Sequence, residues 1–203
     1  MDVRFCDEFD AGFGWIATED VFLQRTSHAI RTDGRVWITD PVDGDGVEAR
    51  IRELGEPAAV VQLIQRHNRD GARIAHRLGV PIYRTPFSGV PESPFEVIKI
   101  ADVPTWREVA LWWPGGRVLV CGDAVGSIGY FRAPGERVGV HPLLRLTPPR
   151  RLAHVDPLHL LVGHGEGLHG EEATRALREA LATARRRMPR ALLFGVVAAL
   201  RRR

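Results

Sequence analysis

The sequence predicts an α/β domain built from two strand-rich halves with helices packed outside them. The chain has 203 residues, of which 44% are hydrophobic and 26% are charged, both close to the averages of globular domains. Apolar runs of strand length alternate with short amphipathic patterns that end at glycine, which is typical of α/β folds. Cys6 and Cys121 are too few for a disulfide scaffold or a four-cysteine zinc site.

The first half is predicted to run hairpin, helix, buried strand, helix, strand. Asp33-Gly34 between two β-rich runs is a strong hairpin signal. Val47, Ile51 and Leu54 recur at helical spacing, and a continuous apolar run follows, as expected for a strand buried on both faces. The expected elements are a hairpin over 24–40, a helix over 44–54, a strand over 58–64, a helix over 71–78 and a strand over 80–84.

The second half is predicted to begin with strands and to end with a long helix. A Pro-Gly-Gly turn at 114–116 separates two further β-rich runs, which should form another hairpin. Pro189 should interrupt or restart the last helix. The expected elements are a strand over 97–100, a hairpin over 108–113 and 117–121, loop and short helix over 134–157, a strand over 158–162 and a helix over 171–188.

The two ends of the chain bear on location and partners. The first ten residues are acidic and mixed, and no apolar run reaches 18 residues. We therefore expect neither a signal peptide nor a membrane span, and we expect a cytoplasmic location.

We divide the chain into a domain over 1–188 and a tail over 189–203. The tail places ten apolar residues between arginines. Packing within the protein or a homodimer is the favoured interpretation, a membrane surface or a protein partner stays open, and nucleic acid is not favoured.

Four loops rich in glycine and polar residues follow the expected strands. They are Thr39–Pro41, Arg66–Gly71, Gly122–Gly126 and Gly163–Gly167. Ligands of α/β proteins bind beyond the carboxyl ends of strands. The sequence therefore predicts that these four loops form one site.

The order of these motifs resembles the metallo-β-lactamase superfamily. The resemblance rests on four features: Asp40 after a hairpin strand, a strand leading into the Asp70-Gly71 helix start, RVLVCGDAVG with Asp123, and HLLVGHGEGLHG with His164. The resemblance spans about residues 27–187. It implies an α+β or α/β fold, a four-layer αβ/βα sandwich with two mixed sheets. It also implies metal-dependent hydrolysis of esters, thioesters, lactams or phosphodiesters.

This chain departs from the family's His-x-His-x-Asp-His signature. Aligned through Asp70, Arg66 and Asn68 stand at the first two histidines and Gly71 at the third. Only Asp70, Asp123 and His164 then match metal-binding positions, and Asp70 can equally be a helix N-cap. His67 should point away from Arg66 on an extended segment. The resemblance gives Asp40 a supporting role by hydrogen bonding.

Two hypotheses about function follow. In the favoured one, Arg66, with or without Arg69, replaces metal charge beside the aspartates, and the protein binds a small molecule or protein partner without catalysis. The pocket would include Arg66, His67, Asn68, Arg69, Asp40 and, near the next helix, His169, and no metal. In the alternative, Asp70, Asp123 and His164, with or without His67 from a remodelled loop, hold one zinc, manganese or iron ion in a hydrolase acting on esters, thioesters or phosphodiesters.

Overall fold

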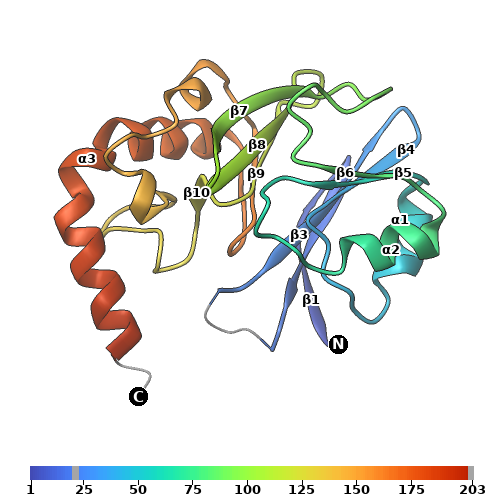
Figure 1. Cartoon of the computed structure of the whole chain (residues 1–203), viewed down its shortest axis with the longest axis horizontal. Coiled ribbons are helices and arrows are strands. Elements are labelled where there is room, and N and C mark those ends of the chain that lie inside the picture. Colours follow the sequence, from blue (N-terminus) through green and yellow to red (C-terminus); the bar gives the residue numbers. More distant parts are fainter. Residues whose placement is uncertain (20–22, 201–203) are drawn as a thin grey trace.

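Two mixed β-sheets lie next to each other, with α1 and α2 on the outer side of one and α3 beyond the other (Figure 1). The computed structural model describes residues 1–19 and 23–200, with the backbone alone over 190–200. The expected α/β sandwich with two mixed sheets is thus confirmed. A separate two-stranded ribbon pairs β10 (Val125–Gly126) with β11 (Gly139–Val140).

The first sheet holds the N-terminal half of the chain in the order β1-β2-β3-β4-β5-β6. Neighbours pair antiparallel as far as β4, whereas β4–β5 and β5–β6 are parallel. The helices α1 (Val47–Leu54) and α2 (Gly71–Leu78) make the two crossovers. The strands are β1 (Val3–Phe9), β2 (Gly12–Ala17), β3 (Thr26–Thr32), β4 (Arg35–Thr39), β5 (Glu56–Gln62) and β6 (Ile82–Arg84).

The second sheet holds the C-terminal half in the order β13-β12-β9-β8-β7. Only β12 and β9 are parallel, and the β8–β9 hairpin forms as predicted. Two 3-10 turns, η1 (Pro142–Leu144) and η2 (Arg150–His154), and α3 (Glu171–Leu200) complete this half. The strands are β7 (Glu96–Val103), β8 (Trp106–Trp113), β9 (Val118–Cys121), β12 (His159–Val162) and β13 (Leu168–His169).

Three apolar clusters separate the four layers. Ile51 and Ile74 pack α1 and α2 against the first sheet, Trp37 and Val120 lie between the two sheets, and Leu177 packs α3 against the second sheet. Successive side chains of a strand point to opposite faces, so a strand in an inner layer must be apolar on both. That requirement explains the continuous apolar run of β5 and fixes the helix–sheet–sheet–helix order.

Helix α2 has the predicted bounds, and its sequence explains both ends. Ile74, Ala75 and Leu78 form its buried face. Gly79 follows in the left-handed conformation at φ 72°, and its N–H donates to carbonyls of the last turn, an arrangement that favours glycine. The strand that precedes α2 ends at Gln62, so a loop of eight residues separates it from the helix and carries the Arg66–Asp70 segment.

Helix α3 corrects the expectation about Pro189. One helix runs from Glu171 to Leu200 with Pro189 inside it. Proline removes one backbone N–H and crowds the carbonyl four residues earlier, which kinks or breaks a helix, and here the helix continues through it. Figure 1 shows α3 turning before its last part runs away from the sheets. Among the described residues, no helix contains the continuous apolar stretch that spanning a membrane requires.

The interpretations of the tail over 189–203 concern side chains that fall almost entirely outside the described residues. Packing within the protein, a homodimer and a membrane surface therefore stay predictions.

Candidate functional site

The four predicted loops meet at one place. Asp40 follows β4, His67 follows β5, Asp123 follows β9 and His164 follows β12. Because β4 and β5 are parallel, and β9 and β12 are parallel, each pair delivers its loops at the same edge of its sheet. The apposition of the two edges brings all four side chains into one buried polar cluster.

A glycine allows the last two loops to approach closely. A Cβ atom on Gly163 would lie 2.7 Å from the Gly122 carbonyl oxygen and 3.0 Å from Cε1 of His67. Instead, the Gly163 N–H donates to that carbonyl at 3.2 Å. The glycine therefore lets His164, the next residue, reach the Asp123 loop.

His67, Asp123 and His164 form the centre of the cluster. Nε2 of His67 and Nε2 of His164 each lie 3.0 Å from Oδ1 of Asp123. All three donor atoms lie within 4.8 Å of one another, and all three residues are buried. A histidine, a carboxylate and a second histidine at such spacing are chemically able to hold a metal ion.

The contacts of the Nδ1 atoms of His67 and His164 indicate which ring nitrogens carry hydrogen. Nδ1 of His67 contacts Oδ2 of Asp40 at 2.7 Å, and Nδ1 of His164 contacts the Leu23 carbonyl at 2.7 Å. An ionised carboxylate and a carbonyl only accept hydrogen bonds, so both Nδ1 atoms carry hydrogen. Each Nε2 then faces Asp123 either as the second N–H of an imidazolium or as a lone pair that needs a cation between it and the carboxylate.

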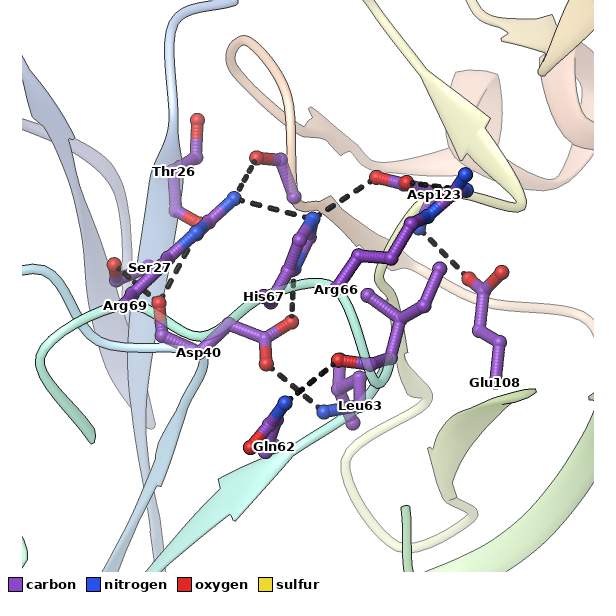
Figure 2. Close-up of polar contacts among 12 residues, drawn as sticks. Thr26, Ser27, Asp40, Gln62, Leu63, Arg66, His67, Arg69, Glu108 and Asp123 are labelled. Atoms are coloured by element: carbon purple, nitrogen blue, oxygen red, sulfur yellow. Dashed lines mark hydrogen bonds and ion pairs between the residues drawn. The ribbon is translucent and has the colours of Figure 1, made fainter. Parts of the chain in front are cut away.

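The direction of His67 differs from the sequence expectation. The His67 N–H donates to the Ile64 carbonyl at 3.0 Å across a turn, so the segment is not extended and the alternation of strand side chains does not apply. His67 and Arg66 therefore both reach Asp123, as Figure 2 shows. Asn68 is exposed and lines the mouth of the site.

Arg69, two residues after His67, also reaches into the site. Nη1 of Arg69 donates to the carbonyls of Thr26 at 2.6 Å and Asp40 at 3.0 Å, and Nη2 donates to that of Gly163 at 3.0 Å. Nη2 of Arg69 also lies 3.5 Å from Nε2 of His67, so a guanidinium stands beside the nitrogen that a metal would use.

The ion pair expected between Arg66 and Asp123 is present, with Nη2 donating to Oδ2 at 3.2 Å. Arg66 also stacks over Trp106, 4.0 Å from the ring centre. Nε1 of Trp106 donates to Oε2 of Glu108, and Oε1 of Glu108 accepts the N–H groups of Asp123 and Ala124, all at 2.7 Å. Trp106 and Glu108 carry no functional signal in the sequence, where they read as ordinary strand residues.

Asp70, which the sequence analysis grouped with Asp123 and His164, lies elsewhere. It occupies the N-cap position of α2 without a side-chain capping bond. Its Oδ2 accepts the N–H of Asp43 at 2.8 Å, and its Oδ1 pairs with Arg73 at 3.1 Å. These contacts hold its carboxylate in a surface ion-pair network next to α2, so Asp70 is removed from the candidate ligand set.

His169 also lies outside the cluster. Its Nε2 lies 3.4 Å from Oδ1 of Asp7, and its Nδ1 lies 2.8 Å from Nδ1 of His159. Asp7 in turn contacts His28 at 3.1 Å and accepts the Gly167 N–H at 2.8 Å. This second network ties β1 and β3 to the segment that follows His164, so His169 supports that segment from a distance.

A pocket of about 450 Å³ opens over the cluster. Its aromatic wall is Tyr130, Phe131 and His141, from the long connection between β10 and η1. Phe131 stacks on His164 with ring centres 5.5 Å apart, and His141 packs edge-on against Trp106 at 4.7 Å. No sequence motif marked these residues, because Tyr130 and Phe131 lie in a glycine-rich loop after the strand over 117–121, and His141 lies in the stretch over 134–157 expected to be loop and short helix.

Burial and pairing shift the pKa values of this cluster. Although burial raises the pKa of Asp123, the contacts with His164 and His67 outweigh it and hold the value well below the usual range. Burial and the charge of Arg69 lower the pKa of His67, but the carboxylates of Asp40 and Asp123 outweigh them and raise it. Burial, followed by the charge of Asp123, raises the pKa of Glu108 to about 7.

These shifts predict that the folded protein loses stability as pH rises above 6.5. Protonated His67 stabilises the fold fully below its unfolded pKa, and this contribution disappears as pH rises through its higher folded pKa. Glu108 acts in the same direction between about pH 4.5 and 7, where the folded carboxyl group retains a proton that the unfolded one has lost. Melting temperature measured against pH checks this, and the slope should be shallower in His67→Gln. A melting temperature that rises with pH over this range would contradict it.

Comparisons with known proteins place this geometry in context. No protein-family model and no curated protein matches the chain. Among solved structures, the crystal structure of DIM-1 metallo-beta-lactamase has a TM-score of 0.62 at 14% identity, covering 91% of this chain and 99% of that one. DIM-1 exposed to ceftazidime gives 0.57 at 14%, covering 91% and 98%. TMB-1, studied for substrate and inhibitor binding, gives 0.59 at 11%, covering 91% and 99%.

Proposed function

The chain has the metallo-β-lactamase fold, and from that premise we propose that it is a ligand-binding protein whose site works without a resident metal. The contacts of Asp123 carry the proposal. Its carboxylate meets Arg66 through Oδ2 and both His67 and His164 through Oδ1. Three nitrogen groups therefore surround the charge that would otherwise bind a metal.

Charge around His67 supports the same conclusion. His67 lies between the carboxylates of Asp40 and Asp123, with its side chain 7% exposed, which favours the doubly protonated ring. Arg69 places a third cation 3.5 Å from Nε2 of His67. A cation at that nitrogen would be repelled by about 4 kcal/mol per unit charge at 4 Å and effective dielectric 20. Arg66, His67 and Arg69 thus supply the positive charge of the site.

A metal-dependent hydrolase is the second candidate. It is favoured by the two histidines, which both direct Nε2 at Oδ1 of Asp123. Both Nδ1 atoms are held by acceptors, which is how metal-binding histidines are usually oriented. His67, Asp123 and His164 would be the ligands, in place of the set that included Asp70. Zinc, manganese or iron bound there would polarise a carbonyl or phosphoryl oxygen and activate water. Esters, thioesters and phosphodiesters would be the substrates to screen.

Metal content separates the two candidates. We expect elemental mass spectrometry to find far less than one metal per chain after purification without chelator and dialysis against zinc, manganese or iron. The melting temperature should not change on adding zinc. Near-stoichiometric metal that is lost in Asp123→Asn and in His164→Ala, but retained in the exposed-histidine control His76→Ala, would overturn the proposal and establish the second candidate.

A further inference from the structure

The pocket over the cluster has the size and lining of a small-molecule site. At about 450 Å³ it lies within the range of ligand pockets in proteins. Arg25, Arg66 and Arg69 line it together with one carboxylate, Asp123. The lining therefore carries excess positive charge even when every histidine is neutral, and it complements an anion.

Arg66 is oriented for this role before any ligand arrives. Its guanidinium carbon lies over the Trp106 ring, 4.0 Å from the ring centre, and its contact with Asp123 uses Nη2. A guanidinium has five N–H groups in a planar fork that matches the oxygens of a carboxylate or phosphate. The side chain is 41% exposed, so the remaining edge of the fork is accessible from the pocket.

His141 adds a donor of fixed tautomer on the aromatic wall. Its Nδ1 accepts the backbone N–H of Leu143 at 3.2 Å, so the ring hydrogen is on Nε2. Burial lowers the pKa of His141 to about 4, and the ring stays neutral near pH 7. Tyr130 and Phe131 pack edge-on against this ring at 5.5 and 5.2 Å and hold it in place.

The carboxylate at the floor of the pocket is already satisfied. Asp123 accepts contacts from Arg66, His67 and His164, and its side chain is 11% exposed. Arg66 and the His141 ring offer only hydrogen-bond donors to a ligand. A ligand group rich in acceptors therefore suits both of them.

We propose that the pocket binds a small organic oxyanion, a carboxylate or a phosphate monoester, with its oxygens on Arg66 and His141 and its apolar body against Tyr130 and Phe131. The inference rests on the proposed function, because without a metal Arg66 is the cationic group that contacts the anion. Electrostatic attraction of this kind weakens as salt is added.

Calorimetric titration of the full chain at low salt tests the inference with benzoate, phenyl phosphate, inorganic phosphate and uncharged benzyl alcohol. We expect saturable binding of benzoate or phenyl phosphate, weakened by salt, and no binding of benzyl alcohol. Comparison of benzoate with phenyl phosphate separates the two oxyanion classes. Stronger binding of phenyl phosphate than of inorganic phosphate would support the role of the aromatic wall.

Matched variants show which groups carry the binding. Arg66→Gln should weaken it by about tenfold or more, Arg66→Lys should recover part of the loss, and His141→Phe should weaken it while keeping the aromatic wall. The control Arg52→Gln, on the exposed face of α1, should bind as the parent does. Absence of saturable binding to all three oxyanions, or equal affinity in Arg66→Gln, would overturn the inference.

Metal content measured on the same preparation separates the two failures. Protein without metal that binds none of the oxyanions contradicts only the ligand class. Protein with stoichiometric metal contradicts the proposed function, and an affinity that disappears with chelator but survives Arg66→Gln contradicts the ligand inference as well.

Discussion

Replacing Asp123 by alanine is expected to lower the free energy of unfolding by about 3–5 kcal/mol, the usual effect of removing one partner from a buried ionic group. Its side chain is 11% exposed and lies within 3.2 Å of nitrogen atoms of Arg66, His67 and His164. The substitution leaves three donors in or near the core without their shared acceptor. Since a domain is stable by only about 5–15 kcal/mol, this loss is large.

Urea denaturation at neutral pH measures this effect, and two further variants show its origin. Asp123→Asn retains the shape and one acceptor oxygen, so it should lose less than alanine does. Asp102→Ala removes a carboxylate from the exposed pair with Arg107, and such pairs contribute about 1 kcal/mol or less. If Asp123→Ala were no more destabilising than Asp102→Ala, the ionic cluster would not be holding the four loops together.

The elements that the sequence predicted best are those determined by local signals. The hairpin turn at Asp33-Gly34 and the glycine that ends α2 act within a few residues, and both are where they were expected. The convergence of the four loops was also predictable, because it follows from strands that end at a common edge. Asp40, Asp123 and His164 could therefore be found from their positions after strands.

The errors arose where contacts distant in the sequence decide the conformation. A turn closed by the Ile64 carbonyl, not strand alternation, directs His67 into the site. Glu108 is buried because it accepts N–H groups that arrive 15 and 16 residues later in the chain. Glu108 supports Asp123 only in the folded protein, so no local sequence pattern around Glu108 could have revealed this role.

The aromatic wall of the pocket also depends on a buried ion pair. Glu136 and Arg145 form a bidentate ion pair with Oε1–Nη1 and Oε2–Nη2 distances of 3.2 and 2.6 Å, and their side chains are 1% and 0% exposed. Arg145 also donates to the Phe131 carbonyl at 2.6 Å, and Glu136 accepts the Ala133 N–H at 2.7 Å. The pair therefore fastens the connection that carries the pocket wall.

Arg145→Met is accordingly expected to lower the free energy of unfolding by about 3–5 kcal/mol, because it leaves the Glu136 carboxylate buried without its main partner. Arg187 compensates only in part, since its Nη1 lies 3.9 Å from Oε1 of Glu136, beyond hydrogen-bonding distance. The double variant Glu136→Leu with Arg145→Met should recover much of the loss, because no uncompensated charge stays buried. Urea denaturation of the parent, both single variants and the double variant provides the measurement.

The same variant separates stability from ligand binding. In Arg145→Met the Asp123 cluster retains all its partners, whereas the wall with Phe131 and His141 loses a contact that holds it in place. Hydrogen exchange should therefore quicken over 126–145 before it changes around Asp123, because local opening needs less free energy than global unfolding. Benzoate or phenyl phosphate affinity should fall with it. Unchanged exchange over 126–145 in a destabilised Arg145→Met protein would mean that the ion pair stabilises the whole domain and does not hold the wall in particular.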